Sequence, residues 1–266
     1  AIFMRMLYEL YGDEVLRQKA EFRTALKLTG FQLDGVERAS RIMERLGGVL
    51  VCDEVGLGKT FIAGELIHRA TFQNRQEVLC VVPAALKDTT WLPFLKKFDI
   101  SRRVEVVTYD QLRLGDVDAV QHLDRYALIV IDEAHNLRNA ATDRARSVLQ
   151  LLGGAYRKQV VLLTATPVNN SLNDLHTLVS YFVRNDAEFA SLGIPSIAEY
   201  IKRAMSMDPE SLSPEHLFDL MDQVAVRRTR RFIRDTYVGD LITAPDGEEK
   251  AIEFPTPRLY RIDYRL

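Results

Sequence analysis

Short apolar runs separated by amphipathic stretches dominate the middle of the chain. The runs are near-continuous rather than alternating in polarity, which indicates strands buried on both faces, as in a parallel sheet. They cover residues 49–52, 78–82, 104–107, 127–131 and 160–164. Apolar residues at helical spacing predict helices before and between these runs. The predicted helices cover residues 31–46, 61–72, 86–98 and 142–152. The pattern predicts an α/β domain with a parallel sheet and helices on both faces.

The two ends of the chain follow other patterns. Apolar residues at helical spacing, broken at Gly12, predict two short helices in the first 28 residues. After Asn173 the strand signals stop, and helical patterns lead to a basic run that ends at Arg234. These helices are predicted at residues 175–183, 197–204 and 214–226. A Pro-, Gly- and acid-rich stretch at 241–256 is typical of a linker, and residues 259–266 alternate like a strand.

The boundaries follow from these changes of pattern. We expect an N-terminal helical segment at 1–28, the sheet domain at 29–180, a helical protrusion at 181–240 and a linker at 241–266. The chain begins at Ala1 without a methionine and stops directly after a strand-like run. We therefore expect it to be a fragment of a longer protein.

Composition narrows the class of protein. Of the 266 residues, 47% are hydrophobic and 27% charged, as in a globular protein with a sizeable core. The net charge of -2 gives no general attraction to nucleic acid, so such binding would need a local basic surface. The two cysteines, Cys52 and Cys80, lie in apolar runs and are expected to be buried and reduced. No membrane-spanning stretch or signal-peptide pattern occurs, so we expect a cytoplasmic protein, or a nuclear one if eukaryotic.

The first chemical motif, DEVGLGKT at residues 53–60, lies between a predicted strand and a predicted helix. Its glycines allow a tight turn whose NH groups, with the helix dipole, hold phosphate. Lys59 would reach the β and γ phosphates of ATP, and the Thr60 hydroxyl would ligate Mg²⁺. Asp53 stands where the general pattern GxxxxGKT has its first glycine. The predicted ATP-binding residues of this loop are Glu54, Val55, Gly56, Leu57, Gly58, Lys59 and Thr60.

An acidic pair follows another predicted strand. Asp132 is placed to hold the metal, and Glu133 to polarise the attacking water. The alternative is that the pair only caps the helix after it. A third motif, TATP from Thr164, ends the last predicted strand and is either a link from the phosphate site or an ordinary turn of hydroxylated residues.

Two further features leave alternatives open. The arginines of VRRTRRFIR form either a phosphate-binding face, with Arg227 and Arg228, or a solvated helix with salt bridges. Trp91 lies at helical spacing with apolar neighbours, which favours core packing over base stacking. The histidines other than His135 show no metal-ligand spacing.

The order of the motifs resembles the first RecA-like domain of superfamily 2 helicases, most closely the Swi/Snf-type ATPases. The resemblance covers residues 28–231. It rests on FQLDGVERA, DEVGLGKT, VVPAALKDTTW, VVTYDQL, DEAH, TATPVNNSLNDL and VRRTR.

The resemblance implies further roles. Gln32 would contact adenine, and the segments with Pro83 and Ala84 and with Thr108 and Tyr109 would lie along a DNA backbone. Nucleotide and nucleic acid would be coupled through His135, Thr164, Ala165 and Thr166. The family consists mainly of translocases on duplex DNA, and the helical stretch before VRRTR is similar to its protrusion.

The second RecA-like domain of the family supplies arginine fingers from a QxxGRxxR-like segment, which this chain lacks. An arginine finger is worth roughly 10³ to 10⁵ in turnover. We therefore expect the chain alone to bind ATP weakly and to hydrolyse it near background. Two other functions remain: an RNA helicase of the DEAH type, whose motifs are usually GETGSGKT and SAT, and a non-catalytic ATP-dependent interaction module.

Overall fold

The computed structural model describes most of the chain between residues 26 and 254. The described residues are 26–114, 122–168, 172–185, 189–190, 194, 196–206, 220–237, 239–243, 249–251 and 254. The predicted N-terminal helices and the strand-like residues 259–266 lie outside them, as do residues 214–219 of the helix predicted at 214–226.

A parallel sheet of six strands in the order β3-β2-β4-β5-β1-β6 forms the centre of the molecule. All five predicted strands are confirmed, within one residue at each end. Their apolar runs are largely buried, and Leu50, Ile129 and Leu162 have no exposed surface. The strands are β1 Gly48–Val51, β2 Glu77–Val82, β3 Val104–Thr108, β4 Tyr126–Ile131, β5 Gln159–Leu163 and β6 Ala225–Val226.

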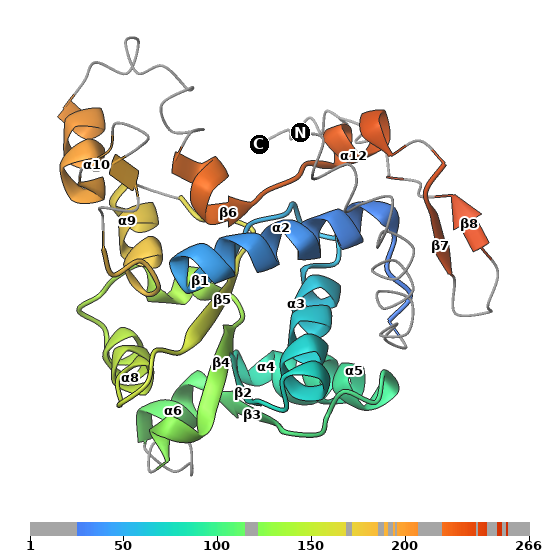
Figure 1. Cartoon of the computed structure of the whole chain (residues 1–266), viewed down its shortest axis with the longest axis horizontal. Helices are drawn as coiled ribbons and strands as arrows, with labels where there is room; N and C mark the ends of the chain where they lie inside the picture. The colour runs from blue at the N-terminus through green and yellow to red at the C-terminus, as the bar shows by residue number, and fades with distance from the viewer. Residues whose placement is uncertain are drawn as a thin grey trace, which may run out of the picture.

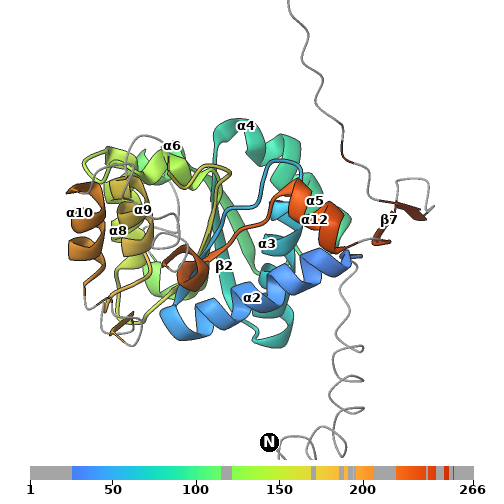
Figure 2. The ribbon, with the colours of Figure 1, turned by 90° about the horizontal axis from the view of Figure 1, so that it is seen from above.

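Helices cover both faces of the sheet, as the sequence predicted (Figures 1 and 2). In the view from above, α3 and α5 lie on one side of the strands and α8 and α9 on the other. The longer helices are α2 Gly30–Leu46, α3 Lys59–His68, α8 Asp143–Leu152, α9 Leu172–Ser180 and α10 Ile197–Ser206. The shorter ones are α4 Ala84–Leu86, α5 Leu92–Lys97, α6 Tyr109–Leu114 and α12 Arg230–Thr236.

Two of the predicted helices contain wider π-helical turns. The helix predicted at 61–72 continues from α3 into η1 Arg69–Gln73, and the helix predicted at 86–98 contains η2 Lys87–Trp91 between α4 and α5. Such turns shift side chains relative to a regular helix and occur often at functional sites. Trp91 ends η2 and is fully buried, so the core interpretation of this residue is confirmed. Both cysteines are buried and unpaired, also as expected.

The sixth strand differs from the sequence prediction. Ala225 and Val226 fall within the helix predicted at 214–226, but they pair in parallel with Leu50 and Val51 of β1. A strand of two residues is too short to show a period in its sequence. The chain thus returns to the sheet inside the predicted protrusion at 181–240. Two short antiparallel strands, β7 Leu241–Thr243 and β8 Glu249–Ala251, lie within the predicted linker.

The segment that begins with β6 and ends with α12, residues 225–236, is called the return segment below. It runs alongside α2 and leads into α12 (Figures 1 and 2). Among the described residues, no helix is both long enough and apolar enough to cross a bilayer.

Candidate nucleotide site at the carboxyl ends of the strands

The DEVGLGKT loop connects the carboxyl end of β1 to the start of α3 at Lys59. Gly56 and Gly58 have φ angles of 86° and 81°. This left-handed backbone conformation is seldom adopted by residues other than glycine. The loop turns tightly and packs on α2, since a Cβ on Gly58 would lie 2.5 Å from the amide nitrogen of Gln32. The Lys59 ammonium donates a hydrogen bond of 2.8 Å to the Asp53 carbonyl across the loop. The loop therefore leads directly into the N-terminus of α3, and Lys59, the first residue of that helix, lies beside the loop, as the motif predicts.

Gln32 contacts the inner side of this loop. Its amide nitrogen lies 3.4 Å from the Leu57 carbonyl oxygen, and its amide oxygen accepts a bond of 3.2 Å from the Thr29 N–H. The side chain is almost fully buried. Gln32 thus links the start of α2 to the phosphate loop, and the adenine contact stays a prediction.

The acidic pair lies at the carboxyl end of β4. Its position is fixed by the backbone, because the Asp132 N–H bonds the Val81 carbonyl of β2 at 2.9 Å. One carboxylate oxygen of Asp132 accepts a bond of 2.8 Å from Trp91 Nε1, and the other accepts 2.8 Å from the Glu133 N–H. Burial raises the pKa of Asp132, and these two hydrogen bonds act in the opposite direction. Sequence reasoning did not find the contribution of Trp91 to this site.

Glu133 turns the chain out of the strand. Its φ of 50° is left-handed, and its carboxylate lies 2.9 Å from His135 Nδ1. It precedes the 3₁₀ helix η4 Ala134–Leu137, but its side chain makes no capping hydrogen bond there. Glu133 therefore does not cap this helix with its side chain, and the pair Glu133–His135 lies at the half-exposed edge of the site.

The TATP turn lies between the two motifs in space, because β5 separates β1 from β4. The Thr164 N–H bonds the Val51 carbonyl at 3.1 Å, and its hydroxyl accepts 3.2 Å from the Thr166 N–H, which is the hydroxylated turn that the sequence allowed. The Thr166 hydroxyl accepts a bond of 2.7 Å from Arg138. Thr164 is buried and Ala165 half-buried. Arg138 joins this turn to the DEAH segment, and no motif signalled it.

The return segment corrects the prediction for Arg228. Its guanidinium is buried, not solvated, and forms an ion pair with the fully buried Asp53 carboxylate, one bond of which measures 3.1 Å. It also donates to the Phe31 carbonyl and lies 5.2 Å from the centre of the Phe31 ring. Arg228 is therefore not available to DNA phosphates. Arg227 beside it is exposed.

Further bonds tie the return segment to the phosphate loop. The Cys52 N–H bonds the Val226 carbonyl at 2.8 Å, and the Glu54 N–H bonds the Arg228 carbonyl at 3.1 Å. The Arg230 N–H bonds the Glu54 carboxylate at 2.8 Å, and the Arg230 guanidinium bonds the carbonyl of the exposed Val55 at 2.8 Å. The return segment, which is distant in sequence, thus stabilises the phosphate loop through hydrogen bonds.

The predicted DNA contacts divide into two groups. Tyr109 is buried, and its hydroxyl donates 2.8 Å to the Asp132 carbonyl, so its side chain supports the acidic pair instead of facing a DNA backbone. The Thr108 hydroxyl accepts a bond of 3.1 Å from the Gln111 N–H and is also buried. Pro83 and Ala84, at the end of β2, are partly and fully exposed, and Arg227 is exposed as well.

Comparison with known proteins identifies the family of this fold. The model of the SNF2-related domain matches residues 94–236, which is more than half of the chain. The chain belongs to the SNF2-related domain family. The matched part of this SNF2-related domain includes the acidic pair, the TATP turn and the return segment.

Individual relatives agree with this assignment. An uncharacterised ATP-dependent helicase of Bacillus subtilis, YqhH, is 28% identical over 73% of the chain and 36% of its own length. A SWI/SNF-related matrix-associated actin-dependent regulator of chromatin, subfamily A-like protein 1, of Bos taurus is 32% identical over 60% of the chain and 18% of its own length. The chain thus spans about a third or less of these relatives.

A solved structure shows the same fold. The SWI2/SNF2 ATPase core of Sulfolobus solfataricus, in complex with double-stranded DNA, aligns with a TM-score of 0.58 at 24% identity. The alignment covers 77% of this chain and 45% of that core. The parallel-sheet architecture with helices on both faces is therefore that of an SNF2 ATPase core.

Proposed function

We propose that this SNF2-related domain binds ATP with Mg²⁺ and forms the first motor domain of a DNA-dependent ATPase that moves along duplex DNA. One observation carries the proposal. The phosphate loop with Lys59 and the partly buried Asp132 lie together at the carboxyl edge of one parallel sheet, where ligands of such folds bind. Membership in the family and the ATP-dependent helicase YqhH support ATP as the nucleotide.

The residues present fit Mg²⁺ bound together with phosphate. Among the described residues, Asp132 forms no ion pair, and no cluster of three or more His, Cys, Asp or Glu side chains is built to hold a metal alone. Mg²⁺ is usually bound by one or two protein oxygens, water and substrate phosphates. Each Asp132 oxygen accepts one hydrogen bond and keeps a lone pair, so the carboxylate can still bind a hydrated cation. When bound, the metal neutralises charge on the phosphates.

The chain's own residues have distinct roles in this proposal. The NH groups of the loop and the N-terminus of α3 hold phosphate, and Lys59 exchanges its bond to the Asp53 carbonyl for a phosphate oxygen. Trp91 and the Glu133 N–H fix the orientation of Asp132. Glu133, half-exposed and beside His135, takes the proton of the attacking water. Arg138 links this edge to Thr166 and is the residue through which the two motifs communicate.

The DNA and the second RecA-like domain are proposed partners. The core from Sulfolobus solfataricus was solved with double-stranded DNA, which supports duplex DNA as the track. In this chain the partly exposed Pro83 and the exposed Ala84 and Arg227 remain as candidates for the DNA-facing surface. Because arginine fingers contribute roughly 10³ to 10⁵ in turnover, we expect the 266-residue chain alone to hydrolyse ATP near background.

The test is ATP hydrolysis by the full-length protein with duplex DNA. Lys59→Ala and Glu133→Gln should each abolish the stimulated rate, whereas Lys202→Ala and Glu199→Gln, exposed on α10, should leave it unchanged. ATP binding by Glu133→Gln should persist. Wild-type rates in either site variant would refute the assigned roles. Stimulation by RNA but not by duplex DNA would refute the proposed track.

A further inference from the structure

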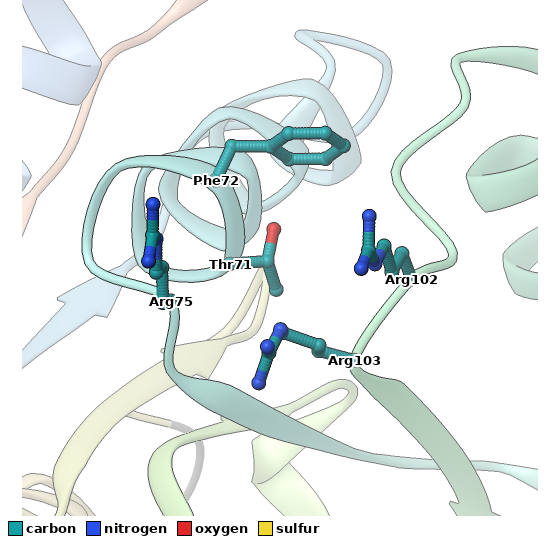
Figure 3. A pocket seen from close by; sticks show the side chains of 5 residues that line it. All are labelled: Thr71, Phe72, Arg75, Arg102 and Arg103. Atoms are coloured by element: carbon teal, nitrogen blue, oxygen red, sulfur yellow. The ribbon is translucent and has the colours of Figure 1, made fainter.

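A second, separate pocket lies at the opposite edge of the sheet from the nucleotide site. Its cavity of about 280 Å³ is lined by Thr71, Phe72, Arg75, Arg102 and Arg103 (Figure 3). Thr71 and Phe72 belong to η1, Arg75 precedes β2, and Arg103 directly precedes β3. The pocket is therefore at the amino ends of β2 and β3. The six residues of β2 separate it from the carboxyl edge by roughly 20 Å, at about 3.3 Å per residue.

The pocket concentrates positive charge, and among the described residues no acidic side chain lines it. Among the described residues, none of its three arginines forms an ion pair or a side-chain hydrogen bond. Glu77, two residues after Arg75, is already engaged by Arg125. Three guanidinium groups around one cavity favour an anion with several oxygens, because each planar group can donate two parallel hydrogen bonds to a phosphate.

Two of these arginines occupy unusual backbone positions. Arg75 and Arg103 have φ angles of 53° and 63°, where glycine would be the least strained residue. Each arginine therefore holds its side chain at the pocket against a local backbone preference. Residues in such conformations cluster at ligand-binding positions.

Phe72 adds an aromatic surface beside the charges. Its ring is 46% exposed and is stacked on His68, with centroids 4.7 Å apart and an interplanar angle of 23°. Burial lowers the pKa of His68, so that the imidazole is neutral at pH 7. In Figure 3 the Phe72 ring lies along one side of the cavity, with the three arginines around the rest. A flat ring next to cationic groups is the combination that binds an unpaired base and its neighbouring phosphates.

We propose that this pocket, Phe72 with Arg75, Arg102 and Arg103, is a binding site for single-stranded nucleic acid. The arginines hold backbone phosphates, and one unpaired base stacks on Phe72. The cavity volume is close to the lower end of ligand pockets, about 300 Å³, which suits one nucleotide unit and not a complete cofactor. Duplex DNA cannot use the stacking surface, because its bases are paired and stacked on each other. This site is independent of the proposed ATP site and shares no residue with it.

The test measures binding of a labelled oligothymidylate of about twelve nucleotides to the 266-residue chain by fluorescence anisotropy, without ATP. Arg102→Gln with Arg103→Gln should weaken binding at least tenfold. It should also flatten the plot of log affinity against log salt by about 1.4, since each lost phosphate contact on a single strand accounts for about 0.7. Duplex binding should not change with these variants. The control Arg203→Gln, exposed on α10, removes one charge elsewhere and should have no effect.

The aromatic contact is tested separately. Phe72→Leu should weaken oligothymidylate binding about fivefold or more, because stacking on an aromatic ring contributes that much per base. Its matched control is Phe232→Leu on α12, since Phe232 is 47% exposed against 46% for Phe72. With the unaltered chain, an abasic oligonucleotide of equal length should bind more weakly than oligothymidylate. Because this comparison uses the unaltered chain, its result does not depend on whether a substituted chain folds.

Several outcomes would overturn the proposal. These are equal binding of the abasic and thymidylate strands, loss of binding in Phe232→Leu in place of Phe72→Leu, and full displacement by inorganic phosphate at the concentration of the nucleotide units. Binding of an oligoglutamate as tight as that of the oligonucleotide, weakened by the same arginine variants, would assign the pocket to an acidic peptide. Failure of ATP hydrolysis in the full-length protein would refute the proposed function and leave this site unaffected.

Discussion

The buried ion pair between Asp53 and Arg228 predicts a large and coupled loss of stability when one partner is removed. Asp53 has no exposed surface and Arg228 is 8% exposed, so neither charge is solvated by water. Removing one partner leaves the other charge buried and uncompensated, which costs about 3 to 5 kcal/mol. Arg228→Met should therefore lower the free energy of unfolding by that amount. Its loss of the bond to the Phe31 carbonyl and of the ring contact acts in the same direction.

The assay is urea unfolding of the 266-residue chain, followed by circular dichroism. Asp53→Asn and Arg228→Met are measured singly and together in a double-mutant cycle. The double variant leaves no buried charge at the pair, so it should lose less stability than the sum of the single losses, with a coupling energy of about 2 kcal/mol or more. Arg228→Lys should recover only part of the loss, because an ammonium cannot make the two-pronged contact with the carboxylate.

An exposed pair on α8 is the control. Asp143 and Arg146 form an ion pair whose side chains are 62% and 69% exposed. The same cycle there should give a coupling energy of about 0.5 kcal/mol or less, because water and salt screen the charges. A coupling energy near zero at Asp53 and Arg228, or one no larger than in the control, would refute the reasoning.

Three further predictions follow from the same contacts. Gly35→Ala should destabilise the chain by about 1 to 3 kcal/mol in urea unfolding, despite the better helix propensity of alanine, because the new Cβ would lie 2.6 Å from the buried Arg228 guanidinium; a stabilised variant would contradict this. Trp91→Phe should raise the pKa of Asp132 further, measured by NMR titration of its carboxyl carbon, because it removes a hydrogen bond that lowers this pKa. A carboxyl group whose pKa is raised by folding contributes stability that is lost as pH rises through its pKa in the folded state. The loss of stability caused by Trp91→Phe should therefore be largest above that pKa. An unchanged pKa of Asp132 in the variant would contradict a hydrogen bond from Trp91. Both cysteines should resist iodoacetamide in the native chain and react in urea, as measured by mass spectrometry, because burial raises the pKa of each thiol.

Features coded by local sequence could be predicted. The five longer strands are rich in Val, Ile and Leu, and such near-continuous apolar runs indicate burial on both faces. The phosphate loop and the acidic pair each follow such a strand directly. Once the sheet is parallel, both must lie at its carboxyl edge. The site could therefore be located without knowledge of the strand order.

Features that depend on distant partners could not be predicted. Tyr109 follows a strand, as a DNA-facing residue would, but its hydroxyl reaches back to the Asp132 carbonyl. Arg138 has no motif of its own, and its role comes from Thr166, 28 residues later. β6 has two residues and is a strand only because the edge of β1 is there to pair with. In each case the partner lies on another element, and no spacing along the chain records it.

The same reasoning explains the residue that departs from the general phosphate-loop pattern. Asp53 stands where that pattern has glycine, and its carboxylate is buried against Arg228, which lies 175 residues later. A glycine at this position would leave the guanidinium buried without its counter-charge, at a cost of several kcal/mol. A chain with only one of the two charged residues is therefore expected to be less stable than a chain with neither of them. The first position of the loop and the return segment are constrained together, so the length of chain needed to form a stable phosphate loop extends from α2 to at least Arg228.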